Sequence, residues 1–118
     1  MEVKELFKNK GEISKMAVTV REINGVELDQ LIAEGKVLAD FYSKVCGPCK
    51  MLSFVLNDVA KNVDDVEIVK LDYDENKETV EKYGVKGYPT LILFNNGQEV
   101  ERLKGLQQKP VIQRMIEG

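Results

Sequence analysis

The chain has 118 residues, of which 43% are hydrophobic and 31% charged, and its net charge at pH 7 is −3. This length predicts one domain with a hydrophobic core large enough to fold without staples. The charge gives no electrostatic reason to expect nucleic acid or an anionic membrane as a partner. No apolar run approaches the about 20 residues that cross a bilayer, and the first residues lack the apolar block of a signal peptide. We therefore expect a cytoplasmic protein, in a compartment where thiols stay reduced.

Residues 1–16 form the first feature along the chain. Their few apolar residues are scattered among seven charged ones, and Gly11 interrupts them. We interpret this stretch as an N-terminal extension that is partly ordered or forms a short amphipathic helix. The domain itself is expected to span residues 17–118.

From residue 17 onward, strand-like and helix-like segments alternate. The predicted elements are a strand at 17–23, a helix at 24–35, a strand at 37–42, a helix at 49–63, a strand at 66–74, a helix at 75–84, a hairpin at 90–105 and a helix at 109–118. The order β-α-β-α-β-α-β-β-α predicts an α/β fold with a mixed central sheet flanked by helices on both faces.

Local signals support several of these elements. Asn24 followed by Glu27 is typical of a capped helix start, and Asn96-Gly97 between two strand-like runs is typical of a hairpin. The helix at 49–63 carries Met51 and Phe54 outside its main apolar stripe. We therefore expect this helix to be buried on more than one side.

Both cysteines of the chain, Cys46 and Cys49, lie in the stretch YSKVCGPCKM, with Gly47 and Pro48 between them. They fall where a buried strand has ended and a helix begins. Residues three apart on a helical turn have Cβ atoms about 5–6 Å apart, which is close enough for a disulfide after a modest adjustment. Pro48 suits the first turn of a helix, where its missing N–H costs nothing.

The position of the two thiols predicts different roles for them. Unpaired N–H groups and the dipole at a helix N-terminus favour an anion, so Cys46 is the expected thiolate and nucleophile. Cys49 lies on the inward face of the helix and is the expected resolving thiol. A metal site typically needs four Cys or His ligands, and the chain has two cysteines and no histidine. A purely structural disulfide is also a poor explanation. A bridge across two intervening residues closes too small a loop to restrict the unfolded chain much, so it would add little stability.

Four successive stretches, VLADFYSKVCGPCKML, VEIVKLDYDEN, YGVKGYPTLILFNNGQEV and LKG, resemble the signatures of the thioredoxin family in family order. The resemblance covers about a hundred residues and implies the thioredoxin fold and reversible dithiol–disulfide exchange. In that scheme Cys46 attacks a disulfide of a client protein, and Cys49 then releases the reduced client and leaves an oxidised pair.

The same resemblance implies further site residues. Asp40 matches the family's buried aspartate, thought to assist proton removal from the resolving thiol, and Lys70 matches the lysine that pairs with it. Pro89, in GYPT, matches the family's cis-proline. The residues assigned to substrate binding are Gly47, Pro48, Gly87, Tyr88, Pro89 and Gly105. From the residues alone, Asp40 also fits a strand-end aspartate bonded to backbone, Lys70 a strand-edge charge, and the glycines ordinary turns.

The resemblance also implies the partners. These are client proteins with disulfides and a thioredoxin reductase that uses NADPH through its own FAD, with no nucleic acid and no membrane. The chain itself is expected to bind no cofactor and no metal and to work through its redox-active disulfide. A monomer is expected, and a dimer through residues 1–16 stays open.

The sequence departs from the family pattern at three positions, and one of these departures, the missing Trp, together with the N-terminal extension leaves a second hypothesis open. Val45 stands where the family usually has Trp, Tyr42 replaces another aromatic, and Phe54 replaces the proline that bends the helix. None of these changes removes a reacting group, although they bear on the redox potential and the substrate range. The alternative to an enzyme is a binding module of the same fold whose thiols contribute little.

Overall fold

The structure is a computed structural model that describes residues 18–118. The predicted extension at 1–16, and the boundary that follows it, lie outside the described residues. The elements in chain order are β1 (Val20–Glu22), α1 (Gly25–Leu31), β2 (Lys36–Tyr42), α2 (Gly47–Ala60), β3 (Val66–Asp72), α3 (Lys77–Lys82), β4 (Thr90–Asn95), β5 (Gln98–Lys104) and α4 (Lys109–Glu117). This order confirms the predicted alternation.

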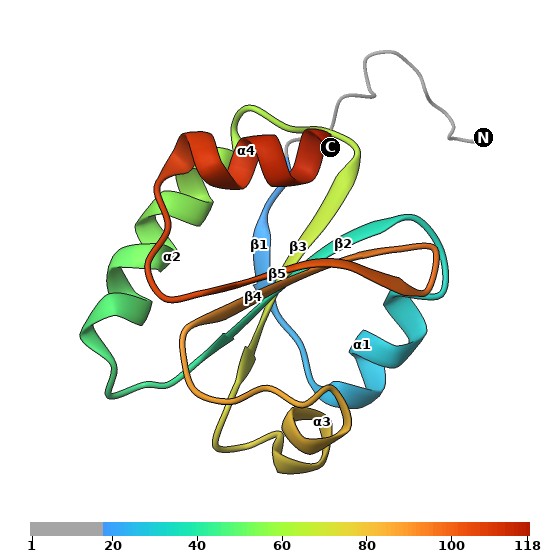
Figure 1. The fold of residues 1–118 in the computed structure, drawn as a ribbon, viewed down its shortest axis with the longest axis vertical. Helices are drawn as coiled ribbons and strands as arrows, with labels where there is room; N and C mark the ends of the chain where they lie inside the picture. Colours follow the sequence, from blue (N-terminus) through green and yellow to red (C-terminus); the bar gives the residue numbers. More distant parts are fainter. Residues whose placement is uncertain (1–17) are drawn as a thin grey trace, which may run out of the picture.

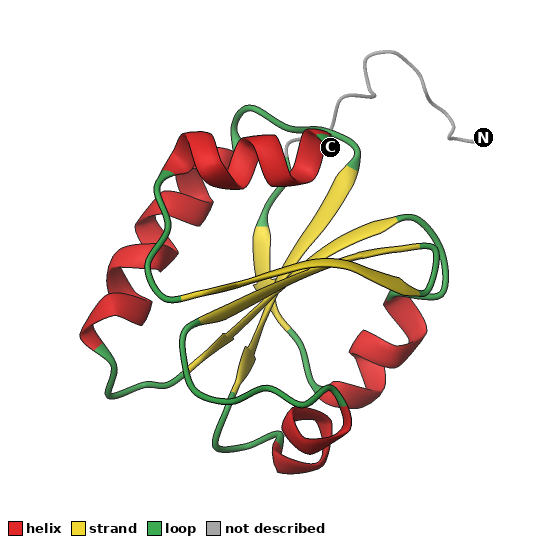
Figure 2. Cartoon of the chain, in the orientation of Figure 1, coloured by secondary structure: helices red, strands yellow, loops and turns green. Residues whose placement is uncertain are grey.

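The strands form one sheet in the order β1-β3-β2-β4-β5. β1, β3 and β2 run parallel, whereas β4 is antiparallel to both β2 and β5. Helices α2 and α4 lie on one side of the sheet and α1 and α3 on the other (Figure 1; Figure 2). The predicted mixed sheet with helices on both faces is therefore confirmed. No helix in the described part of the chain is long and apolar enough to span a bilayer.

β2 is the central strand, and both of its faces are buried. Its odd-numbered residues Val37, Ala39 and Phe41 belong to the core under α1 and α3. Leu38 belongs to the core under α2 and α4. Because side chains alternate along a strand, Asp40 falls on the same face as Leu38, on the side of α2. The alternation thus places a carboxyl group beneath the helix that carries both cysteines.

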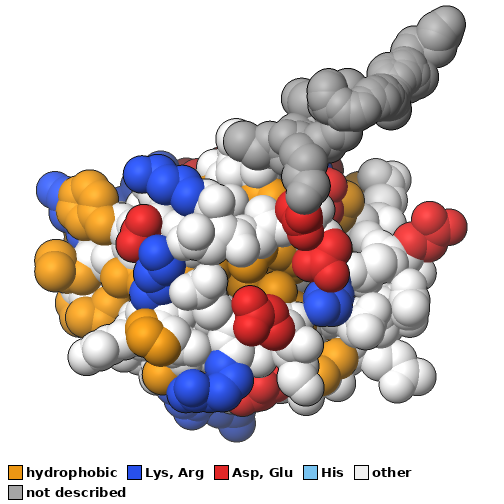
Figure 3. Space-filling model, turned by 90° about the horizontal axis from the view of Figure 1, so that it is seen from above, with side chains coloured by type: hydrophobic (Ala, Val, Ile, Leu, Met, Phe, Trp, Pro, Cys, Tyr) orange, Lys and Arg blue, Asp and Glu red, His pale blue; other side chains and the backbone are white. Residues whose placement is uncertain are grey.

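Helix α2 buries a narrower face than its sequence predicts. Leu52, Leu56 and Val59 are fully buried, but Met51 and Phe54 are 55% and 63% exposed. The prediction of burial on more than one side is wrong, because the sheet and α4 contact only the stripe at helical spacing. In a space-filling view, hydrophobic side chains gather at the left, which is the side of α2 in Figure 1 (Figure 3).

The structure contains the predicted helix cap and the predicted hairpin. The Asn24 side chain accepts a hydrogen bond from the Glu27 N–H while the Glu27 carboxylate accepts one from the Asn24 N–H, both at 2.9 Å. β4 and β5 form the predicted hairpin, and Asn96 and Gly97 at its turn have φ angles of 51° and 87°. These positive angles are the reason for the Asn-Gly pair, since a turn of this kind needs them.

Candidate active site

The two cysteines lie at the start of α2. Cys46 is the N-cap residue of this helix, and Pro48 lies in its first turn. The structure joins Cys46 and Cys49 in a disulfide, with their Cα atoms 5.2 Å apart. The backbone N–H of Cys49 donates a hydrogen bond to the Cys46 sulfur at 3.1 Å. An N–H group at the helix N-terminus is therefore already directed at this sulfur, as the sequence predicts.

The two sulfurs differ in exposure. Cys46 is half-buried, whereas Cys49 is buried, with 4% of its surface exposed. The residue before them, Val45, is 87% exposed. A large molecule can reach Cys46 more easily than Cys49, and this is the order that the attacking and resolving roles require.

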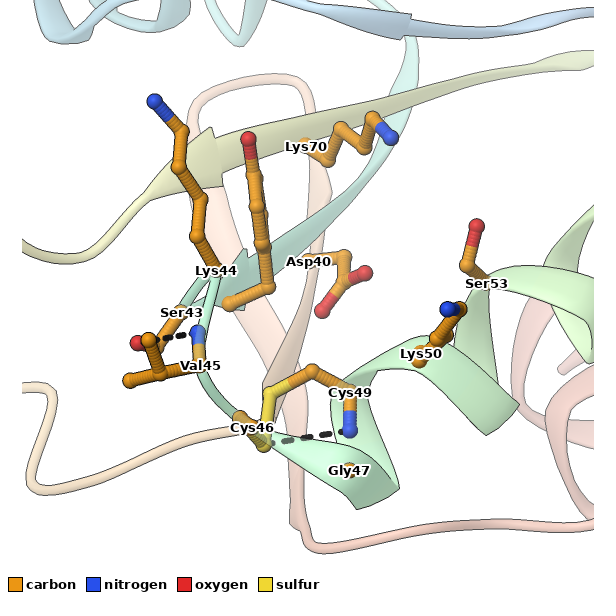
Figure 4. A pocket seen from close by; sticks show the side chains of 11 residues that line it. Asp40, Ser43, Lys44, Val45, Cys46, Gly47, Cys49, Lys50, Ser53 and Lys70 are labelled. Carbon is orange, nitrogen blue, oxygen red and sulfur yellow. Dashed lines mark hydrogen bonds between the residues drawn. A yellow bond between two sulfur atoms is a disulfide. The ribbon is translucent and has the colours of Figure 1, made fainter.

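Asp40 lies beneath the disulfide. Its residue is 2% exposed, and its Oδ1 atom has no hydrogen-bond partner among the described residues. Burial raises the pKa of the Asp40 carboxyl to about 7, while the Lys70 charge lowers the pKa and the Glu22 charge raises it. Asp40, Lys70 and both cysteines line one cavity of about 390 Å³. In Figure 4 the carboxyl group of Asp40 points toward Cys49. A buried carboxyl that titrates near neutral pH is suited to accept a proton.

Lys70 shares the cavity with Asp40 without forming an ion pair with it. Asp40 lies between Lys70 and Cys49 in Figure 4. The Lys70 ammonium lies over the ring of Tyr42, 5.3 Å from the ring centroid. The structure therefore brings the aspartate and the lysine of the sequence prediction together but leaves their charges apart.

The predicted substrate-binding loop lies at the same end of the sheet. The Tyr88-Pro89 peptide bond is cis, as expected. Thr90 is the register partner of Phe41 near the end of β2, so the loop before Thr90 adjoins the segment that leads to Cys46. The Gly105 N–H donates a hydrogen bond to the Pro89 carbonyl at 2.8 Å. Two chain segments of the prediction, the loop at 87–89 and Gly105, are thus in direct contact.

Sequence reasoning missed two interactions next to the site. The Tyr42 hydroxyl donates to both carboxylate oxygens of Glu22, at 2.7 Å each. Lys44 lies 3.5 Å from the buried Asp72 carboxylate and 3.4 Å from that of Glu75. These contacts depend on which strands are neighbours, and no local pattern in the sequence contains that information.

The family model for thioredoxin matches residues 18–118, which is nearly all of the chain. The chain belongs to the thioredoxin family. A thioredoxin of Chlamydia pneumoniae is 42% identical over 97 residues, covering 82% of this chain and 95% of that relative. A thioredoxin of Bacillus subtilis is 45% identical over 85 residues, covering 71% and 82% of the two chains.

A solved structure agrees with this assignment. A point mutant of a thioredoxin from Halobacterium salinarum superposes with a TM-score of 0.78 at 41% identity, covering 83% of this chain and 88% of that one. Thioredoxins work through a redox-active disulfide rather than a bound cofactor. With a disulfide between Cys46 and Cys49 in the structure, this member of the thioredoxin family is a thiol–disulfide oxidoreductase.

Proposed function

We propose that this protein reduces disulfides of other proteins, with Cys46 as the nucleophile and Cys49 as the resolving thiol. The observation that carries the proposal is the hydrogen bond from the Cys49 N–H to the Cys46 sulfur at the N-cap of α2. In the reduced protein this donor and the helix dipole stabilise a Cys46 thiolate. The thiolate is the form that attacks a disulfide.

The reaction takes two exchange steps. The Cys46 thiolate attacks one sulfur of the client disulfide, and the other client sulfur leaves as a thiolate. The Cys49 thiol then gives its proton to the Asp40 carboxylate, and its sulfur attacks the Cys46 sulfur. The bond between Cys46 and the client breaks, and the second client sulfur leaves as a thiolate. The client gains two electrons, and the protein ends as the 46–49 disulfide.

Asp40 is the base of the second step because of its surroundings. The carboxyl group is buried in the cavity beside Cys49, and its pKa is raised to about 7. At neutral pH a fraction of the molecules therefore holds an ionised carboxylate that gains by taking a proton. We assign Lys70 an electrostatic role in this step, since its charge lowers the pKa of Asp40.

The surface around Cys46 suits an extended client segment. Val45 and Tyr88 are 87% and 43% exposed, and both lie at the end of the sheet that carries the disulfide. We assign client binding to these side chains, to Gly47 and Pro48 between the cysteines, and to the backbone at 87–89 and at Gly105, which pairs with the client as an added strand does. We further propose that the protein acts as a monomer in the cytoplasm and that a thioredoxin reductase returns it to the dithiol form.

Trapping of mixed disulfides tests the two cysteine roles. With Cys49→Ser, the first step still proceeds and the second does not, so client proteins should stay covalently bound through Cys46. Non-reducing gels followed by mass spectrometry should detect these adducts. The control is Cys46→Ser, which keeps the buried thiol and should trap none. Equal trapping by both variants would contradict the assigned roles.

A redox titration separates this function from that of a binding module. The 46–49 pair is equilibrated in dithiothreitol and glutathione buffers, alkylated and weighed by mass spectrometry. A midpoint near about −270 mV is expected for a reductant of this type, whereas about −200 mV would indicate a more oxidising role. A pair that forms no reversible disulfide would leave only the binding module.

A further inference from the structure

Three charged side chains form a row across three neighbouring strands. Glu22 on β1 is the register partner of Lys70 on β3, and Lys70 is the register partner of Asp40 on β2. Register partners in parallel strands point to the same face of a sheet. The row therefore lies on the α2 side of the sheet, with an exposed carboxylate at one end, the half-buried lysine in the middle and the buried carboxyl at the other end.

Tyr42 contacts Glu22 at one end of this row and Lys70 in its middle. It lies two residues after Asp40 on β2, so its side chain leaves the same face of the strand. Its hydroxyl reaches Glu22 on β1 with two contacts of 2.7 Å, and β3 lies between these strands. The Lys70 ammonium lies 5.3 Å from the centroid of the Tyr42 ring. A cation over an aromatic face is attracted by the ring, and Glu22 fixes that ring in place.

The arrangement leaves Asp40 without a charged partner in contact among the described residues. Its Oδ1 atom accepts no hydrogen bond from them, although a lysine is its register partner. The other side chains facing the same cavity include Cys49, Lys50 and Ser53 from α2 and Lys44 from the loop before it. The register partner of Asp40 on β4 is the apolar Leu91. The pKa of Asp40 responds in opposite directions to Lys70 and to Glu22. Burial raises the pKa of Asp40 most, and the position of the lysine sets how far its charge offsets that rise.

We propose that Glu22 and Tyr42 are positioning residues for the redox step: they hold the Lys70 ammonium over the Tyr42 ring and out of an ion pair with Asp40. An ion pair would keep Asp40 ionised and make it a weaker acceptor for the Cys49 proton. This inference rests on the proposed function, because it gives a purpose to the base role of Asp40. It adds a third strand, β1, to the machinery of the site, and with it a second carboxylate.

Glu22→Gln is the variant that tests the proposal. The amide oxygen still accepts the Tyr42 hydroxyl hydrogen bond, so the change removes charge and little else. Glu22 is also the register partner of Lys70, so its charge attracts the ammonium toward β1 and away from Asp40. With that charge lost, Lys70 is free to move toward Asp40, and the titration midpoint of Asp40 should fall. Lys70 is the register partner of Asp40 on the adjacent strand, about 4.8 Å away. The approach of its ammonium should make the total fall about one pH unit, of which direct repulsion from Glu22 two strands away supplies less than half. This midpoint is measured by carbon-13 NMR of the Asp40 carboxyl in the oxidised protein, with Asp40→Asn used to assign the signal.

A second background separates the proposed route from plain repulsion between two carboxylates. In Lys70→Met, Glu22 has no lysine to hold, so Glu22→Gln should shift the Asp40 midpoint by less than half of its shift in the wild-type background. The control is Glu67→Gln, which removes an exposed carboxylate from β3 and should shift nothing. An unchanged midpoint in Glu22→Gln, or equal shifts in both backgrounds, would overturn the proposal.

Results that contradict the proposed function differ from results that contradict the positioning role. If Asp40→Asn leaves the pH dependence of the resolving step unchanged, then Asp40 is not the base, and the NMR titration still reports how Glu22 acts on Asp40. If Asp40→Asn changes the pH dependence of the resolving step, the base role of Asp40 stands. If Glu22→Gln then changes neither this pH dependence nor the NMR midpoint of Asp40, the positioning role is overturned.

Discussion

Asp40 and Lys70 face each other as register partners on β2 and β3, but no ion pair joins their side chains. The Lys70 ammonium lies over the ring of Tyr42 instead. Asp40 is buried, and its Oδ1 atom has no hydrogen-bond partner within the described part of the chain. A buried carboxyl without a partner favours its neutral form. This relationship ties the stability of the fold to the protonation of one group.

The free energy of unfolding should fall as the pH rises from about 4 to about 7. In this window the folded chain keeps a proton on Asp40, whose pKa is about 7, while the unfolded chain with a pKa of 3.8 has lost it. The unfolded state then binds fewer protons, so stability is greatest below the window and is reduced above it. The full difference is of the order of 4 kcal/mol at 1.36 kcal/mol per pKa unit.

Asp40→Asn should therefore stabilise the protein at pH 8 by about 2–4 kcal/mol and should change little at pH 4. Urea denaturation at both pH values measures this. Asp58→Asn, an exposed carboxylate on α2 that pairs with Lys109, is the control and should leave the pH dependence as it is. A wild-type protein that is equally stable at pH 4.5 and pH 8 would argue against a neutral buried Asp40.

A second prediction concerns the exposed side of α2. Phe54→Ala should change the free energy of unfolding by less than about 1 kcal/mol, because the ring is 63% exposed. Leu56→Ala, two residues further along and fully buried, should cost about 2–5 kcal/mol. Urea denaturation of both variants gives the comparison, and a cost of several kcal/mol for Phe54→Ala would mean that the ring packs on the fold.

A third prediction concerns the close approach of Gly25 and Thr79. A Cβ atom at Gly25 would overlap the Thr79 hydroxyl and lie 3.0 Å from the Thr79 Cβ. Gly25→Ala should therefore destabilise the protein by about 1–3 kcal/mol, although alanine is the better helix former. In a Thr79→Ala background the cost should shrink by at least about 0.5 kcal/mol.

Gly47→Ala is the matched control for this contact. Gly47 is also the first residue of its helix, but no described residue lies within 4 Å of the Cβ it would gain. This variant should be neutral or slightly more stable in thermal unfolding. Equal effects of the two alanines would show that helix propensity, rather than the Thr79 contact, sets the outcome.

Gly105→Ala should affect protein clients selectively. Gly105 has a φ of 83° and contacts the Pro89 carbonyl, and a new Cβ would enter open space. The proposed client strand needs that space, so kcat/KM toward a protein disulfide should fall about tenfold, an expected loss of about 1.4 kcal/mol of transition-state binding. The redox midpoint should stay unchanged. Gly84→Ala, with a similar positive φ of 62° at the end of α3, controls for backbone strain and should keep full activity.

The sequence predicts most of the fold because its signals are local. Alternating apolar runs, the Asn24 cap and the Asn96-Gly97 turn each act within a few residues, and the structure contains them all. The sequence also predicts which cysteine caps α2 and which points inward, because the start of a helix fixes both positions. The predicted burial of Phe54 is wrong, because helical spacing shows which face of a helix is apolar but not which elements are available to cover it.

The part of the site that could not be predicted depends on strand neighbours. Glu22 and Tyr42 are twenty residues apart and touch only because β1 lies next to β3 and β3 next to β2. The placement of Lys70 over a ring rather than against Asp40 likewise results from that order. Motif spacing identifies the reacting groups, whereas their electrostatic surroundings come from the topology.

The strand order has a consequence for the behaviour of the protein at high concentration. The two edges of the sheet, as described for residues 18–118, are β1 and β5. β1 is only three residues long, while β5 carries charges along its length, at Glu99, Glu101, Arg102 and Lys104, and its pairing with β4 is irregular at Leu93 and Phe94. A short edge and a charged, irregular one are poor templates for strand addition from another copy. The architecture thus protects the sheet against edge-to-edge aggregation.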